Sequence, residues 1–136
     1  LSDDLRRAGI RADCLHGDIK QATREKTMAD FRHGKLPVLI ATDVASRGID
    51  VDDVDGVINY DVPEENEYYI HRIGRTGRAR KKGISFTLLG SFPEKAKLDE
   101  IAKFAGFRIV PMIFDEYGCL VPAPAEEKHP TSRRRF

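Results

Sequence analysis

The sequence predicts an α/β fold with a mainly parallel sheet, and two observations support that class. Short apolar runs alternate along the 136 residues with stretches in which apolar side chains recur at helical spacing. Residues 37–42 form an unbroken apolar run, typical of a strand covered on both faces, and residues 56–61 form a second run that ends at Pro63. This order of strands and helices favours parallel strands joined by right-handed crossovers.

Each element has its own signal in the chain. Strands are predicted at apolar runs, namely residues 12–16, 37–42, 56–61, 83–89 and 107–114, with Pro111 limiting the last to an edge position. Helices are predicted at residues 1–8, 18–33, 71–78 and 93–104. Asp18 and Gln21 form a capping box at the start of the second helix, and Gly34 stops it.

Composition limits the classes of function. Hydrophobic residues make up 40% of the chain and the net charge is +1, so contacts with nucleic acid must come from local clusters. Cys14 and Cys119 lie far apart and, with the four scattered histidines, match no metal-ligand spacing, so we expect no metal site. The sequence carries no signal peptide or membrane-length apolar run, which favours a cytoplasmic protein without a membrane partner.

The most informative segment runs from His71 to Arg78, where three arginines recur at every third residue with glycines between them. At about 100° per residue, Arg72, Arg75 and Arg78 would fan over one side of a helical turn, and His71 would share that side. Clustered guanidinium groups repel one another unless they meet negative charge, and their planar fork fits phosphate oxygens. The regular spacing disfavours the alternative, a solvated basic helix face.

Polar side chains follow several predicted strand ends, where ligands bind in open α/β sheets. The segments are residues 16–18, 42–50 and 71–78, which bring hydroxyls, glycine amides, carboxylates and guanidinium groups to one edge of the sheet. This set of groups fits a phosphate-rich ligand. Gln21 and Arg24 share the apolar stripe of the second helix and need partners there, so bracing of a nearby loop and ligand contact both stay open for them.

These segments also carry the motifs of a known family. Residues 15–18 with Gln21 and Arg24 are similar to the motif that precedes motif V of the DEAD-box RNA helicases, residues 41–50 with 57–63 resemble motif V and its following strand, and residues 71–78 resemble motif VI. The order and separations of the motifs agree with the family as well. His71 favours DEAD-box proteins over their DEAH and RecQ-type relatives, which usually carry glutamine there.

The resemblance implies the second RecA-like domain of such a helicase. We expect a three-layer α/β sandwich over residues 1–121 and a flexible tail at residues 122–136. The family pattern would place one more strand and most of a helix before Leu1, so an N-terminally truncated sheet would expose an edge or a gap. The sequence lacks a Gly-x-x-x-x-Gly-Lys-Ser/Thr loop and an Asp-Glu-Ala-Asp run, which the family places in an upstream domain.

The resemblance also implies residue roles. Arg75 and Arg78 would be the catalytic arginine fingers that reach the γ-phosphate of ATP, and Asp50 would accept a hydrogen bond from its ribose. His71 and Arg72 would couple this site to the other domain. Contacts to the RNA sugar-phosphate backbone would come from Gly17, Gln21, Arg24, Thr42, Asp43, Arg47 and Gly48. A loop-capping carboxylate is the alternative for Asp50, and a strand-end cap is the alternative for Thr42.

The implied protein is an ATP-dependent RNA helicase of which this chain is the C-terminal half. Its cofactor would be ATP with Mg²⁺, the ion being held mainly by the N-terminal RecA-like domain of the same protein. RNA would be bound with little sequence preference, and the chain alone would not hydrolyse ATP. Two alternatives stay open: a related superfamily-2 motor that acts on DNA, and an RNA-binding module that has lost its motor.

Overall fold

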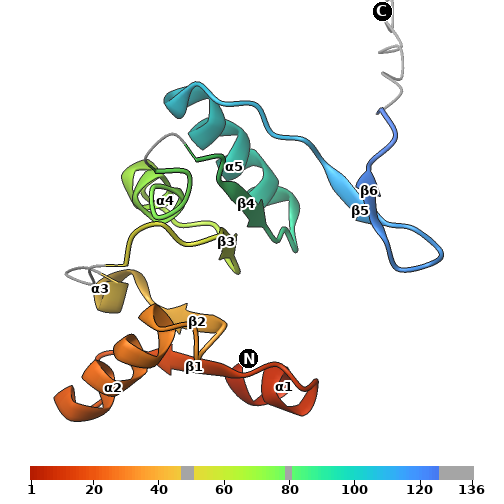
Figure 1. Cartoon of the computed structure of the whole chain (residues 1–136). Coiled ribbons are helices and arrows are strands. Elements are labelled where there is room, and N and C mark those ends of the chain that lie inside the picture. The colour runs from red at the N-terminus through yellow and green to blue at the C-terminus, as the bar shows by residue number, and fades with distance from the viewer. Residues whose placement is uncertain (47–50, 79–80, 126–136) are drawn as a thin grey trace, which may run out of the picture.

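A computed structural model describes residues 1–46, 51–78 and 81–125, in which helices and strands alternate (Figure 1). The helices are α1 (Ser2–Arg7), α2 (Gln21–Arg32), α3 (Asp43–Ser46), α4 (Asn66–Ile73) and α5 (Phe92–Ala105). The strands are β1 (Ala12–Leu15), β2 (Val38–Ala41), β3 (Gly56–Asn59), β4 (Ile84–Thr87), β5 (Met112–Phe114) and β6 (Leu120–Pro122). The first four predicted strands and the predicted helices at residues 1–8 and 93–104 are confirmed, with small shifts at their ends.

The strands pair in parallel, as the α/β class predicts. β1 pairs with β2 in the register that joins Ala12 to Val38, and β3 pairs with β4 in the register that joins Gly56 to Ile84. Within the described part of the chain β2 and β3 share no ladder, so these strands form two separate parallel pairs (Figure 1). Among the described residues, both outer edges of each pair therefore lack a ladder to a further strand.

The strands are less buried than their apolar runs predict. Along β2 the residues are half-buried up to Ile40 and Ala41 is exposed, whereas coverage on both faces was expected. In the other pair Ile58 is 69% exposed and its register partner Phe86 is 37% exposed. Register partners share a face of a sheet, so this apolar face of β3 and β4 is open among the described residues. The physical reason is that each strand has a single paired neighbour.

Two small cores position the segments that follow the strands. They consist of Leu15, Met28 and Ala45 in the first, and of Tyr69, Leu98 and Ile101 in the second. The first core fixes α3 against α2 and β1. The second fixes α4 against α5, and the ring of Tyr69 stacks on Phe107 with 5.8 Å between centroids. Because α3 and α4 carry candidate site residues, the cores hold those residues in place.

The second helix begins later than its capping box predicts. α2 starts at Gln21, and its N-cap residue Lys20 makes no capping hydrogen bond with its side chain. Asp18 lies in the preceding turn, where its amide donates to Nδ1 of His16 at 3.2 Å and the carbonyl of His16 accepts from Ile19 at 3.3 Å. The predicted start at Asp18 is therefore wrong, because His16 holds this stretch in a turn.

The C-terminal part forms a hairpin that the sequence did not predict. The strand expected at residues 107–114 is reduced to β5, which pairs antiparallel with β6. The connecting turn has Gly118 at a φ of 76° and Asp115 accepting the amides of Tyr117 and Cys119. Figure 1 shows the hairpin set apart from the two parallel pairs, at the end of the extended segment that follows α5. Most of the tail predicted at residues 122–136 lies outside the described residues, which end at 125.

Candidate functional site

The arginine segment is a helix end followed by a turn. α4 stops at Ile73, and the amides of Arg75 and Thr76 then bond to carbonyls three residues earlier, at 3.3 and 3.2 Å. Gly77 has a φ of 72°, which turns the chain out of the helix. The prediction that Arg72, Arg75 and Arg78 share one side of a helical turn is therefore wrong, since only Arg72 lies within α4.

Two glycines allow this turn to close. A Cβ atom on Gly83 would lie 2.5 Å from the backbone nitrogen of Gly77, closer than side-chain carbons pack against backbone. The two backbones are thus in direct contact, which brings the start of β4 against the arginine turn. A side chain at position 83 would clash with the backbone of Gly77, and a side chain at position 77 would be strained by its positive φ. This explains why both positions carry glycine.

The stretch before β3 is tied to the same turn. The amide of Val54 donates to the carbonyl of Arg75 at 3.1 Å, and the hydroxyl of Thr76 donates to the carbonyl of Val54 at 2.6 Å. The backbones of Val54 and Thr76 form an isolated parallel bridge. The residues just before Val54 are consequently held opposite Arg75 and Arg78.

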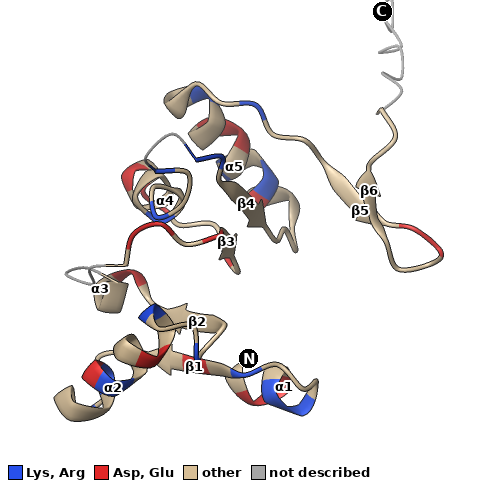
Figure 2. Ribbon diagram, viewed as in Figure 1, with Lys and Arg blue, Asp and Glu red and all other residues tan. Residues whose placement is uncertain are grey.

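Asp52 occupies that position and pairs with both arginines. Its carboxylate accepts from Arg78 at 2.7 Å and from Arg75 at 3.5 Å. Nε of Arg78 also donates to the carbonyl of Gly74 at 2.7 Å. In Figure 2 the acidic stretch leading into β3 lies beside the basic stretch that follows α4. Two guanidinium groups from one turn thus converge on a single anionic group, which sequence reasoning did not anticipate.

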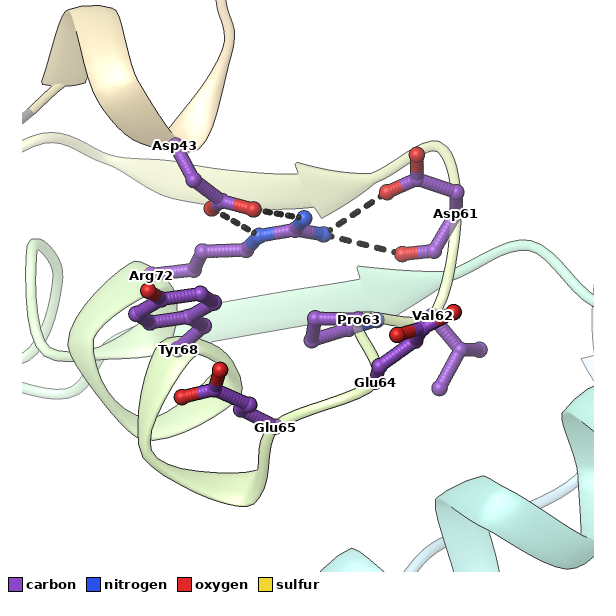
Figure 3. Close-up of a pocket in the computed structure, with 8 residues that line it drawn as sticks. All are labelled: Asp43, Asp61, Val62, Pro63, Glu64, Glu65, Tyr68 and Arg72. Atoms are coloured by element: carbon purple, nitrogen blue, oxygen red, sulfur yellow. Dashed lines mark hydrogen bonds and ion pairs between the residues drawn. The ribbon is translucent and has the colours of Figure 1, made fainter.

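Arg72 lies between two other carboxylates, as Figure 3 shows. Its Nε and one terminal nitrogen each donate to Asp43 at 2.7 Å, and the other terminal nitrogen donates to the carbonyl and the carboxylate of Asp61 at 2.9 Å each. The hydrogen bonds to Asp43 raise the pKa of the Arg72 guanidinium, against the opposing effect of burial. Arg72 therefore links α4 to the N-terminus of α3 and to the segment after β3.

A cavity of about 420 Å³ adjoins this ion pair. Its wall comprises Asp43, Asp61, Val62, Pro63, Glu64, Glu65, Tyr68 and Arg72 (Figure 3). Arg72 is the one cation among these residues, and its side chain is 19% exposed. His71, its neighbour in the predicted coupling pair, is exposed.

The residues expected at the RNA backbone gather at the ends of β1 and β2. Gly17 follows β1 and has open space around it, and Thr42 follows β2 directly. The hydroxyl of Thr42 accepts the amide of Ala45 at 3.2 Å, so Thr42 caps the start of α3. Because β1 and β2 are parallel, the two ends lie at the same edge. Arg47, Gly48 and Asp50 lie outside the described residues.

Arg24 and Gln21 make different contacts. The guanidinium of Arg24 donates to the carbonyl of Ala45 at 2.7 Å, which braces the end of α3. Gln21 is exposed and donates to Glu25 one turn along α2 at 3.1 Å. The sequence left two roles open for Arg24, namely bracing of a nearby loop and ligand contact. In the structure Arg24 braces a neighbouring segment, close to the ends of β1 and β2 where RNA contacts are expected.

Across residues 1–46, 51–78 and 81–125, no three His, Cys, Asp or Glu side chains are grouped as metal ligands would be. Over the same ranges, none of the helices combines the length and apolar character that crossing a membrane requires.

The chain is similar to known proteins over most of its length. The family described as helicase conserved C-terminal domain matches residues 1–80, more than half of the chain. The chain belongs to this helicase family. Its relatives identify it further as a C-terminal helicase domain of the DEAD-box type, as the three motifs predicted.

The DEAD-box relatives are much longer than this domain. The chain is 46% identical over 115 residues to the probable ATP-dependent RNA helicase DDX17 of Homo sapiens, a match of 83% of the chain and 16% of that protein. It is 50% identical over 112 residues to the ATP-dependent RNA helicase FAL1 of Saccharomyces cerevisiae, a match of 82% and 28%. The DEAD-box domain described here thus spans less than a third of either relative.

Solved structures confirm the RecA-like fold of the DEAD-box domain. The C-terminal domain of the DEAD-box protein Dbp5 is similar with a TM-score of 0.72 and 38% identity, over 76% of this chain and 61% of that one. A DEAD box protein from the hyperthermophile Methanococcus jannaschii is similar with a TM-score of 0.71 and 46% identity, over 79% and 29%. The α/β class and the parallel strand pairs agree with this fold.

Proposed function

We propose that the domain is the C-terminal half of an ATP-dependent RNA helicase, in which it supplies arginine fingers and contacts to the RNA backbone. The observation that carries the proposal is the convergence of Arg75 and Arg78 on one carboxylate. Two guanidinium groups that together bind one carboxylate are also suited to bind the γ-phosphate of ATP. The names of DDX17 and FAL1 as ATP-dependent RNA helicases support the same activity.

The chemistry assigned to Arg75 and Arg78 is electrostatic. Charge spreads over the oxygens of the transferring phosphoryl group in the transition state, and guanidinium groups placed on those oxygens stabilise it. An arginine finger accelerates such transfer by about 10³- to 10⁵-fold, equivalent to about 4–7 kcal/mol of barrier. Both side chains are partly exposed, 31% for Arg75 and 51% for Arg78, so they can reach a nucleotide outside this domain. Asp50 is proposed to contact the ribose.

The upstream RecA-like domain is proposed to supply what this chain lacks. A phosphate-binding loop and the carboxylates that hold Mg²⁺ would come from that domain, because neither motif stands in this sequence. ATP would then bind between the two domains, and the arginine turn would approach it only when they close. Water would be excluded from the phosphate at the same time.

RNA is proposed to bind at the edge formed by the ends of β1 and β2. The open space around Gly17 lets a phosphate approach the backbone amides, and the hydroxyl of Thr42 lies at the same edge. Asp43, Arg47, Gly48, Gln21 and Arg24 are the further proposed RNA residues. A structure of S. cerevisiae Dbp5 bound to RNA and ADP BeF3, with a TM-score of 0.70 and 38% identity to this chain, supports RNA as the ligand of the domain. Contacts to sugar and phosphate give little sequence preference.

Arg72 is proposed to couple the RNA edge to the nucleotide site. Its bidentate bond to Asp43 joins α4, which leads into the arginine turn, to α3, which follows Thr42. A shift of α3 on RNA binding would therefore move the base of the arginine turn. His71, exposed on the same helix, is proposed to contact the other domain.

The proposed activity is tested by nucleic-acid stimulation of ATP hydrolysis. The helicase that contains this domain is assayed with single-stranded RNA and with DNA of the same sequence. Stimulation by RNA and not by DNA supports the RNA helicase. Stimulation by DNA instead would assign the domain to a DNA motor, and the absence of hydrolysis with either would leave an RNA-binding module.

A further inference from the structure

We propose that Asp52 is the resting counter-ion of the arginine fingers, and that Arg75 and Arg78 exchange its carboxylate for a phosphate when nucleotide arrives. Asp52 would thereby act as a latch that sets how readily the arginine pair accepts a polyphosphate. The inference rests on the proposed function in one respect only, namely that the anion received is the γ-phosphate of ATP.

The contacts around Asp52 fit a latch. One carboxylate oxygen accepts from Arg78 at 2.7 Å and the other from Arg75 at 3.5 Å, so one anion serves both fingers. The Asp52 side chain is 38% exposed, which leaves the site accessible to a competing anion from solution. The longer bond of Arg75 indicates that this arginine is held less tightly by Asp52 than Arg78 is.

The backbone keeps Asp52 in this position. Val54 and Thr76 form a parallel bridge, and the hydroxyl of Thr76 also donates to the carbonyl of Val54. Asp52 lies two residues before Val54, so these contacts hold its backbone next to the arginine turn. When the arginines leave, Asp52 stays behind as an unpaired, solvated carboxylate.

The negative charges of Asp52 and of the phosphate make binding of one exclude binding of the other. A carboxylate and a phosphate repel each other, so both are not expected to occupy the space between the same two guanidinium groups. Phosphate carries more negative charge and more acceptor oxygens than a carboxylate, so it displaces Asp52 when it is delivered at sufficient concentration. Removing the Asp52 charge takes away the competitor and should tighten binding of polyphosphate.

The neighbouring residue offers a matched control. Asp53 pairs with Lys81 at 2.5 Å, whereas Asp52 pairs with Arg75 and Arg78. Asp53→Asn removes the same unit of charge one residue away from Asp52. Asp53 has a φ of 65°, and asparagine tolerates that left-handed backbone well, so the substitution introduces no strain.

The test is a titration of the 136-residue chain with inorganic tripolyphosphate, followed through the Nε–H resonances of Arg75 and Arg78 by NMR. Asp52→Asn is expected to bind about three- to tenfold tighter than wild type, equivalent to about 0.7–1.4 kcal/mol. Asp53→Asn is expected to change the affinity less than twofold. Equal effects of the two substitutions, or weaker binding by Asp52→Asn, would overturn the proposal.

A second measurement uses the unaltered chain and so does not depend on how a variant folds. The carboxyl carbon resonance of Asp52 is expected to shift as tripolyphosphate saturates the arginines, because the exchange releases its hydrogen bonds. Saturation of Arg75 and Arg78 with no change at Asp52 would contradict the exchange. Neither measurement uses ATP hydrolysis, so the latch and the helicase function can fail independently.

Discussion

Arg72 and Asp43, which are 29 positions apart in the sequence, are joined by two parallel hydrogen bonds of 2.7 Å. The pair crosses from α4 to α3 and is largely shielded, with side-chain exposures of 19% for Arg72 and 28% for Asp43. A bidentate pair of this kind fixes angle as well as distance. The pair therefore determines the orientation of the arginine turn relative to the end of β2.

Arg72→Ala is expected to lower the free energy of unfolding by about 1.5–3 kcal/mol, because it removes two charge-assisted hydrogen bonds to a largely shielded carboxylate. Urea denaturation followed by circular dichroism measures this change. Arg7→Ala is the control, since Arg7 pairs with Asp4 at 2.9 Å on the surface, with side chains 78% and 68% exposed, and should contribute less than about 1 kcal/mol. Equal losses in the two variants would show that the Arg72 bridge contributes no more than a surface pair.

Gly83→Ala is expected to destabilise the domain by about 1–3 kcal/mol, because the added methyl would meet the backbone of Gly77 at 2.5 Å and neither backbone can yield cheaply. Gly17→Ala is the matched substitution, since nothing lies within 4 Å of the added methyl. Thermal unfolding of both variants measures the difference. A stable Gly83→Ala variant would contradict the close contact of the two glycines.

Glu100 is expected to make stability depend on acid pH. Hydrogen bonds from Lys97 and then from Asn66 hold the pKa of Glu100 below its ordinary value. A carboxylate with a depressed folded pKa contributes stability above its unfolded pKa, about 4.3, and loses it as the pH falls through the folded value. Glu100→Gln should therefore lower the urea midpoint at pH 7 and make stability less dependent on pH below about 4.3. An acid dependence of stability that is the same in Glu100→Gln and in wild type would contradict this role of the carboxylate.

The isolated chain is expected to bind single-stranded RNA weakly and with a marked dependence on salt. With about three phosphate contacts, the logarithm of the binding constant should fall against the logarithm of salt concentration with a slope near −2. Fluorescence anisotropy of a labelled oligonucleotide at several salt concentrations measures this slope. A flat response would remove the phosphate contacts from the proposed RNA edge.

Local signals in the sequence predicted much of the fold. The apolar runs located the four parallel strands, and the helical spacing of residues 93–104 located α5. The caps of α5 were not used in that prediction: the hydroxyl of Ser91 accepts the amide of Glu94 at 3.4 Å, and Gly106 ends the helix with a φ of 75°. The strands and α5 depend on neighbours within a few residues, and that is why sequence spacing reveals them.

Features that depend on distant partners were missed or misplaced. The roles of Asp52 and Asp61 depend on arginines 26 and 11 positions away, which no local pattern reports. α3 and β6, of four and three residues, are too short for periodicity to detect. The arginine segment had a helical period, but the close contact of Gly77 with Gly83 replaced its second half by a turn. The acidic stretch before β3 is a signal that could have suggested a partner for these arginines.

The most direct test of the central claim is RNA-stimulated ATP hydrolysis by the helicase that contains this domain, compared between wild type and Arg75→Ala, with ATP binding measured separately. The isolated chain should hydrolyse no ATP. Arg75→Ala should lower kcat by about 10²-fold or more while ATP still binds, because Arg75 acts on charge that develops in the transition state. An unchanged kcat in the variant would contradict the assignment of Arg75 as an arginine finger.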